Sequence, residues 1–224
     1  MRLVADQFQP GTFVDAIRFI VDNFGMLFHL AVQQLELSFA AIGIALVISL
    51  PLGLWLGHEH RGLFFASSVA NVGRALPSIV LIAFGVVFFG LGFWNNTAAL
   101  VVLAIPPILT NSYFAIDSVD RDLVEAARGM GMTERQVVTQ VELPVGLPLV
   151  IAGIRIATIF VIATATIASI AGGGGLGDVI VNQASYGLSG VVGASLYVSF
   201  LAFGAAALLG LLQRAVSPRP IPQD

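Results

Sequence analysis

Long stretches of this chain contain no charged residue, and their positions constrain the fold more than any other feature of the sequence. About 22 uncharged residues lie between Glu36 and Glu59, and about 42 lie between Arg74 and Asp117. A helix that spans a bilayer needs about 20 predominantly apolar residues. The first stretch therefore predicts one membrane-spanning helix, and the second predicts two that are joined by a tight turn at Gly90–Asn96.

The shortage of charge extends to the whole chain. Only 10% of the residues are charged and 57% are hydrophobic, whereas about a quarter of a soluble domain is charged. This composition predicts an all-α integral membrane protein. The net charge of -3 is not typical of a nucleic-acid-binding protein, which needs a basic face. The absence of Cys excludes thiolate metal sites and Cys nucleophiles.

Two further apolar stretches complete a prediction of five membrane-spanning helices. One runs from Pro144 to about Ala171 and contains a single charge, Arg155, and the other runs from about Val191 to Leu212. Leu63–Val72 is too short to span and predicts a helix that leads into the second span. The predicted spans are 36–57, 76–92, 97–116, 145–171 and 191–212.

The first residues do not resemble a signal peptide, because charges interrupt any apolar core there. Phe13, Ile17, Ile20, Val21 and Phe24 instead have helical spacing, which predicts a short amphipathic helix on the membrane surface.

The distribution of arginine predicts which side of the membrane each loop faces. With the N-terminus outside, the cytoplasmic loops and tail hold most of the basic residues, and the outside holds only Arg2 and Arg18. The predicted cytoplasmic residues are Arg61, Arg121, Arg128, Arg135, Arg214 and Arg219. The loops at 93–96 and 172–190 contain no basic residue. The positive-inside rule therefore predicts that the N-terminus is outside and the C-terminus inside. We expect one transmembrane domain over 1–224, with an outer or interfacial segment 1–35, a cytoplasmic loop 117–143 and a cytoplasmic tail 213–224.

The loop 117–143 is polar but has an apolar pattern of its own. Leu123, Ala126, Ala127 and Met130 follow the i, i+3, i+4, i+7 spacing of one helical face. Asp120 or Asp122 can cap the start of this helix, and Gly129 and Gly131 can end it. An ordinary connecting loop needs no such apolar face, so we expect something to cover it.

A second short helix is predicted directly after Gly131. Thr133 and Gln136 have the spacing of a capping box, and Val137, Val138 and Val141 would lie on the buried face. Leu143-Pro144 would close this helix and start the fourth span. The two short helices are expected to meet at an angle near Gly131, parallel to the membrane.

These residues resemble the EAA loop of permeases from ATP-binding-cassette (ABC) importers. The resemblance rests on Glu125-Ala126-Ala127, Gly131 at a fixed offset and the ending Val141-Glu142-Leu143-Pro144, all between two predicted spans. It implies a type I importer permease fold with a core of five or six helices that functions as a dimer. It also implies that Glu125, Ala126, Ala127, Gly131, Leu143 and Pro144 form the coupling helix that contacts the ATPase subunit.

A narrower resemblance covers residues 30–212, to the permeases for glycine betaine, carnitine and choline. Its motifs are Arg74–Ser78, Thr110–Tyr113, Val119-Asp120, Glu125–Thr133 (EAARGMGMT), Ala152–Arg155 and Ala163–Gly177 (ATATIASIAGGGGLG). D-methionine permeases share the EAA loop and the Gly-rich element but match the other stretches less well. The resemblance implies a quaternary-ammonium compatible solute as substrate, and another small solute such as D-methionine stays open.

The same resemblance implies the partners. We expect two ATPase subunits that bind ATP and Mg, a separate periplasmic or extracellular solute-binding protein and a second permease chain, in a homodimer or a heterodimer. The chain itself is expected to bind no cofactor, metal or nucleic acid and to lie in the bacterial inner membrane. A self-sufficient secondary transporter is the competing interpretation, but such proteins place ionisable groups at mid-membrane, where this sequence offers Arg155 alone.

Candidate residues for the gate or translocation path lie on the fourth span. Arg155 is about 11 residues past Pro144, roughly 16 Å along a helix, where a charge usually faces protein or water or extends back to the interface. Thr158, Thr164, Thr166 and Ser169 would provide a weakly polar path, although helix packing explains them equally well.

Other motifs do not point to catalysis. Gly172–Gly175 lacks the Lys-Ser/Thr of a phosphate-binding loop, so we interpret it as a close-packed turn before a short helix at Leu176–Ser185. His29, His58 and His60 share no metal-ligand spacing and are expected to be solvated at membrane edges. Because no catalytic constellation occurs within a span, we expect the chain not to be an enzyme.

Overall fold

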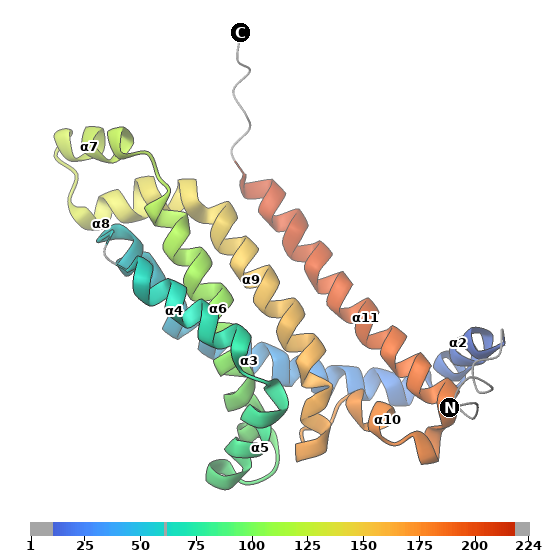
Figure 1. Ribbon diagram of the computed structural model, residues 1–224. Coiled ribbons are helices and arrows are strands. Elements are labelled where there is room, and N and C mark those ends of the chain that lie inside the picture. Colours follow the sequence, from blue (N-terminus) through green and yellow to red (C-terminus); the bar gives the residue numbers. More distant parts are fainter. Residues whose placement is uncertain (1–10, 61, 218–224) are drawn as a thin grey trace. The chain divides into compact units, whose positions relative to one another are not determined.

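The computed structural model describes residues 11–60 and 62–217, and Figure 1 shows that they form helices and connecting turns, with no strand among them. Arg2, Arg61 and Arg219, which contribute to the predicted orientation, lie outside the described residues. The helices are α2 (Thr12–Asp22), α3 (Phe24–His58), α4 (Leu63–Ala75), α5 (Ser78–Phe89), α6 (Phe93–Asp117), α7 (Arg121–Gly129), α8 (Glu134–Val137), the π-helical turn η1 (Val138–Glu142), α9 (Leu143–Ala165), the 3-10 helix η2 (Ile167–Ala171), α10 (Gly177–Val181) and α11 (Gln183–Val216).

Four helical runs are long and apolar enough to cross a membrane: α3, α6, Glu134–Ala165 and α11. They confirm four of the predicted spans. A helix suits a bilayer because it satisfies every backbone hydrogen bond internally. The predicted boundaries are less accurate. The first span was placed at residues 36–57, but α3 begins at Phe24, since Glu36 is exposed on the helix surface and does not interrupt it.

The predicted second span, 76–92, is broken. The helix Ser78–Phe89 has 12 residues, about 18 Å at 1.5 Å per residue, which is shorter than a hydrocarbon core of about 30 Å. It could count as a fifth span only together with Leu63–Gly73, the helix expected before it. The break has a local cause: Leu76, which precedes Pro77, is extended at φ -77° and ψ 117°, because proline disfavours helical geometry in the residue before it.

The turn between α5 and α6 is tighter than expected. Gly90 and Gly92 have positive φ values of 70° and 117°, and these two residues reverse the chain. The predicted loop at 93–96 is therefore wrong, since Phe93–Asn96 already form the first turn of α6.

The chain divides into two compact units, which we describe separately. Unit 1 comprises Met1–Ala41, Pro77–Leu100 and Phe160–Gly204, and unit 2 comprises Ile42–Leu76, Val101–Ile159 and Ala205–Asp224.

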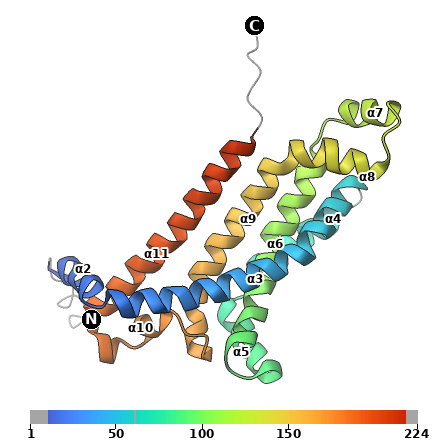
Figure 2. The same ribbon diagram turned by 180° about the vertical axis from the view of Figure 1, so that it is seen from behind.

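In unit 1, α2 packs beside the start of α11, as both views show (Figures 1 and 2). Phe19 makes an edge-to-face contact with Tyr186, and a Cβ on Gly193 would approach the Ala16 carbonyl to 3.1 Å. The predicted amphipathic helix is confirmed as a helix. Its apolar residues Phe13 and Ile17 are more than half exposed, and its location at the membrane surface stays a prediction.

The glycine-rich segment of unit 1 is the close-packed turn that the sequence predicts. Gly172, Gly174 and Gly175 have φ values of 71°, 69° and 93°, which side-chain-bearing residues rarely adopt. The buried Gln34 fixes this turn from α3, since its Nε2 donates to the Ile162 carbonyl (2.9 Å) and its Oε1 accepts from the Leu176 amide (3.1 Å). The following helix is shorter than expected, Gly177–Val181, because Asn182 leaves helical geometry.

In unit 2, the second part of α3 packs closely against α6. A Cβ on Gly53 would lie 2.8 Å from the Leu109 carbonyl oxygen, and one on Gly57 would lie 2.6 Å from that of Tyr113. Glycine at this spacing lets two helix backbones approach directly, a common packing mode in membranes. Gly146 and Gly153 bring α9 equally close to α6 at Ala115 and Pro107. The loop 117–143 therefore connects α6 and α9, which already pack tightly on each other.

Candidate functional site

The first helix of the loop, α7, starts where the sequence places it. Asp120 is the N-cap, and its Oδ1 accepts a hydrogen bond from the Asp122 amide at 3.0 Å. Asp122 lies in the first turn and Arg128 in the last, so both charges interact favourably with the helix dipole and stabilise α7.

The two faces of α7 differ sharply. Val124 and Ala127 are buried in a small cluster with Val119 and Val137. In the predicted apolar stripe, only Ala127 lies inside this cluster, whereas Leu123 and Met130 are 45% and 74% exposed. Ala126 and Glu125 are exposed as well. The loop thus holds itself together with one set of residues and presents another, partly apolar set outward.

Gly131 turns the chain between the two short helices, as predicted. Its φ is 84°, and a Cβ there would meet nothing within 4 Å. The requirement for glycine at this position is therefore conformational and does not come from crowding.

The capping box of the second helix is confirmed. The Thr133 amide donates to Gln136 Oε1 at 2.8 Å, and the Gln136 amide donates to Thr133 Oγ1 at 3.4 Å. The predicted end of this helix at Leu143-Pro144 is wrong, because a continuous helical run extends from Glu134 to Ala165. The π-helical turn Val138–Glu142 widens the helix just before Pro144, which accommodates a ring that would otherwise clash with the preceding turn.

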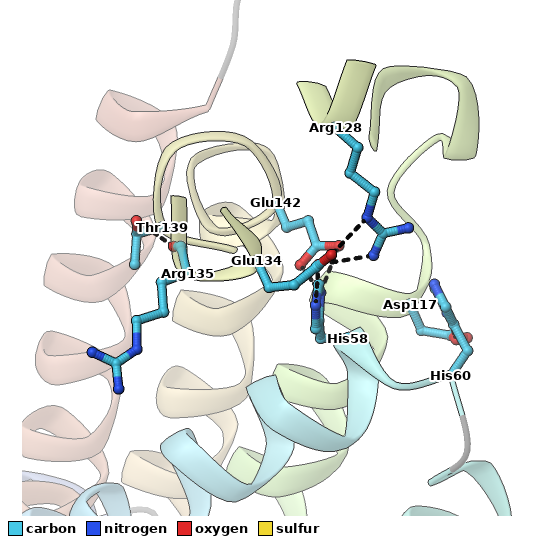
Figure 3. Close-up of polar contacts among 8 residues, drawn as sticks. All are labelled: His58, His60, Asp117, Arg128, Glu134, Arg135, Thr139 and Glu142. Carbon is cyan, nitrogen blue, oxygen red and sulfur yellow. Dashed lines mark hydrogen bonds and ion pairs between the residues drawn. The ribbon is translucent and has the colours of Figure 1, made fainter. Parts of the chain in front are cut away.

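A network of charged side chains joins the loop to the end of α3 (Figure 3). His58 Nδ1 lies 2.8 Å from Glu142 Oε2, and His58 Nε2 lies 3.0 Å from Glu134 Oε2. Arg128 donates to both oxygens of Glu134, through Nε at 3.1 Å and Nη2 at 2.9 Å. This bidentate hydrogen bond raises the pKa of Arg128 above its already high ordinary value.

The expectation of a solvated side chain is wrong for His58. Its side chain is 11% exposed, and that of its partner Glu142 is 1% exposed. His60 is exposed, as expected, and its Nδ1 lies 2.8 Å from Asp117 Oδ1. Sequence reasoning missed these partners because His58 and Glu142 are separated by 84 positions, and no local spacing rule connects residues so far apart. Among the described residues, no group of three or more His, Cys, Asp or Glu side chains could hold a metal ion.

The candidate path residues belong to two elements and to both units. Arg155, Thr158 and Thr164 lie on α9, whereas Thr166 is the N-cap of η2 and Ser169 lies in it. Arg155 and Thr158 belong to unit 2, and Thr164, Thr166 and Ser169 belong to unit 1. Thr158 is 5% exposed and donates to the Ile154 carbonyl at 2.8 Å. Thr166 donates to the Ala163 carbonyl and Ser169 to that of Thr166. These hydroxyl groups satisfy the backbone around them, and a role in the path stays a prediction.

Arg155 is partly buried, and its Nη1 would lie 3.3 Å from a Cβ on Gly210 of α11. The guanidinium therefore lies close to α11 at a position that has no side chain. Leu143 is half-buried and Pro144 exposed at the start of α9.

Comparison with known proteins decides the family. The model of the binding-protein-dependent transport system inner membrane component matches residues 49–221. The chain belongs to this family. It is the permease component of an ABC importer in the bacterial membrane, as the EAA resemblance implied, and the secondary-transporter interpretation is set aside.

Curated relatives align with the permease over most of its length. The "Carnitine transport permease protein OpuCB" of Listeria monocytogenes is 35% identical over 84% of this chain and 87% of its own. The "Glycine betaine/carnitine/choline transport system permease protein OpuCB" of Bacillus subtilis is 33% identical over 90% and 93%. The "Osmoprotectant import permease protein OsmW" of Salmonella typhimurium is 34% identical over 93% and 100%.

Solved structures confirm the type I permease fold. An inward-facing form of the MetNI methionine ABC transporter superposes on the permease with a TM-score of 0.76 and 25% identity, covering 87% of this chain and 98% of that chain. A crystal structure of an amino acid ABC transporter with histidines gives a TM-score of 0.68 at 21% identity and so supports the fold alone.

Proposed function

We propose that the permease imports a quaternary-ammonium compatible solute such as glycine betaine, carnitine or choline. The observation that carries this proposal is the identity of 33–35% to permeases whose names specify these solutes or osmoprotectants, over 84–93% of the chain. The methionine transporter shares the fold at the lower identity of 25%. D-methionine is accordingly the second candidate.

Uptake into proteoliposomes that contain the permease with its ATPase and binding protein tests the substrate class. Labelled glycine betaine should accumulate with ATP, and unlabelled carnitine or choline should compete, while D-methionine should not. Accumulation of D-methionine without that of betaine would overturn the substrate class and leave the family assignment intact.

The exposed face of α7 is the proposed contact with the ATPase. It combines the carboxylate of Glu125 with the apolar side chains of Leu123 and Met130, which are 45% and 74% exposed. A face of this kind suits a protein partner, because apolar contacts provide affinity and a charge provides specificity. Glu125, Ala126 and Gly131 would shape this contact, whereas Ala127 anchors α7 to the loop and Leu143 and Pro144 start the attached span.

The remaining partners follow from the same role. Two permease chains, identical or related, would form the path, and two ATPase subunits would bind ATP and Mg. A separate binding protein would deliver the solute. ATPase closure would move the loop and, through the continuous helix Glu134–Ala165, the span attached to it.

Replacing Glu125 tests the contact. In the exposed α7 face, Glu125→Ala should leave the amount of membrane-inserted permease unchanged. Removing one partner of a partly desolvated interface charge pair costs about 2–5 kcal/mol of binding free energy, so co-purification with the ATPase should fall steeply. Asp22→Ala, which removes an exposed carboxylate on α2, is the matched control. Unchanged ATPase binding and uptake in Glu125→Ala would show that the loop is only a connector.

A further inference from the structure

We propose that His58, held between the carboxylates of Glu134 and Glu142, is a positioning residue that ties the end of α3 to the coupling loop, so that movement of the loop reaches the first span. This inference rests on the proposed role of the loop as the ATPase contact. Neither the sequence motif nor the α7 face includes His58.

The backbone that carries His58 is packed against α6. Gly57 precedes it directly, and a Cβ there would lie 2.6 Å from the Tyr113 carbonyl oxygen and 2.9 Å from the Ile116 Cβ. α3 and α6 are thus in backbone contact one residue before the imidazole. A force on the His58 side chain is transmitted to a tightly packed helix pair and is not lost in a flexible loop.

Both nitrogens of the His58 ring contact a carboxyl group. His58 places Nδ1 2.8 Å from Glu142 and Nε2 3.0 Å from Glu134. An imidazole ring can use both of its nitrogens in hydrogen bonds at once, so one ring bridges the two side chains.

Burial explains why Glu142 needs a partner. Glu142 is 1% exposed, and a buried carboxyl group without a hydrogen-bond partner costs free energy. In the described part of the chain, His58 is the basic side chain in direct contact with Glu142. Glu134 is different, because it is 61% exposed and is also held by Arg128.

The contacts form a continuous path across separate elements. His58 on α3 contacts Glu134 on α8, and Glu134 accepts two hydrogen bonds from Arg128 on α7. His58 also contacts Glu142, which precedes α9. One imidazole ring therefore contacts both ends of the helical segment 134–142, and through Glu134 it is linked to the helix that carries the exposed face.

Contacts that do not involve His58 also hold the loop. The cluster of Val119, Val124, Ala127 and Val137 does not include it, and His60 with Asp117 forms a second link nearby. Loss of the His58 contacts should consequently loosen the connection while these other contacts remain. The side chains in ion-pair contact in this region are Glu134, Glu142 and Arg128, together with the His60–Asp117 pair.

The test uses the complete complex with ATPase and binding protein in proteoliposomes, with labelled glycine betaine as the transported probe. His58→Gln removes the ring that contacts both carboxylates and should lower betaine uptake per ATP hydrolysed by about tenfold, the scale of a lost hydrogen bond to a charged group. His58→Arg keeps a permanent two-pronged donor and should restore most of the coupling. His29→Gln, which replaces an exposed histidine hydrogen-bonded to Gln33 within α3, should behave as wild type.

The two variants of His58 separate positioning from simple packing. The coupling ratio should be low in His58→Gln and close to that of the wild type in His58→Arg. Wild-type coupling in His58→Gln, or a coupling ratio in His58→Arg as low as that in His58→Gln, would overturn the proposal.

A measurement on the wild type removes any dependence on the folding of variants. The permease contains 3 His, so ¹⁵N-histidine labelling of this subunit alone gives few ring signals, which the His29 and His60 variants assign. We expect both ring nitrogens of His58 to give the signals of hydrogen-bonded nitrogens, and a ring with the signals of a solvated histidine would overturn the proposal. If the complex moves no betaine, the proposed substrate class fails, but this ring signal still tests His58.

Discussion

The segment 166–182, which joins α9 to α11, and the loop 117–143, which joins α6 to α9, are held in place by different chemistry. Left-handed glycines and neutral, buried amides fix the first, with Gln34 bridging two backbone groups. Charged side chains fix the second, among them His58, Glu134 and Arg128, and the last two are well exposed. Neutral buried contacts tolerate little change in geometry, whereas exposed ion pairs re-form at small cost. The difference indicates a rigid joint in one segment and a movable one in the other.

The largest effect on stability is expected at Gly177, in the rigid segment. A Cβ at this position would overlap the Thr166 carbonyl oxygen. Gly177→Ala should therefore destabilise the permease by more than about 3 kcal/mol, the upper part of the range for overpacking, and lower its thermal midpoint and its amount in the membrane. Gly204→Ala is the matched control, because nothing lies within 4 Å of its added Cβ. Equal thermal midpoints in the two variants would contradict a close-packed joint.

Gln34→Leu is expected to have the next largest effect. It leaves the Ile162 carbonyl and the Leu176 amide without their hydrogen-bond partner, at a cost of about 2 kcal/mol for unpaired buried groups. Thermal unfolding in detergent measures this loss. Gln33→Leu should cost less, since Gln33 is less buried and its contact with the Gly175 amide is 3.4 Å long. A larger loss in Gln33→Leu than in Gln34→Leu would refute this ranking.

A smaller change in stability is expected at Gly131, in the charged loop. Because the φ of Gly131 is 84°, Gly131→Ala should lower the free energy of unfolding by about 1 kcal/mol. The change should also alter the direction of α8, so solute uptake should fall by a larger fraction than stability does. Gly129→Ala is the control, because Gly129 lies in α7 with a negative φ and open space around it. If Gly131→Ala loses stability and uptake in the same proportion, the loop has no separate role in coupling.

No change in stability is expected from single cysteines that report on which side each segment lies. The chain has no native Cys, and both Asn182 and Gln140 are exposed. Arginine placement predicts that Asn182→Cys reacts with a membrane-impermeant maleimide from outside and that Gln140→Cys reacts only in opened membranes. Labelling of both from outside intact cells would contradict the predicted orientation.

The sequence allowed much of the fold to be predicted because a helix that crosses a bilayer needs about 20 predominantly apolar residues. Runs without charge located α3, α6, α9 and α11, and local chemistry identified the Asp120 cap and the Thr133–Gln136 capping box. The broken second span was missed because the count of apolar residues ignores the conformational effect of Pro77 on Leu76. The start of α3 was missed because Glu36 can point outward from a continuous helix.

The candidate site was predicted only where its residues are close in sequence. Glu125, Gly131 and their neighbours form one motif, and their positions in the loop follow from helix periodicity and turn chemistry. The His58–Glu142 contact depends on how α3 and α9 pack on α6, and charges alone do not encode that packing. The hydroxyl groups of Thr158 and Ser169 were ambiguous from sequence, and their hydrogen bonds to backbone carbonyls explain why.

Site-specific photo-crosslinking from Met130 tests the central claim most directly. A photoreactive residue at this 74% exposed position of α7, in the assembled transporter, should crosslink to the ATPase subunit. The same residue at Val181, which is 54% exposed in the segment 166–182, should not. We predict an ATPase adduct from Met130 and none from Val181. A transport-competent complex in which Met130 gives no ATPase adduct would contradict the assignment of the loop 117–143 as the coupling site.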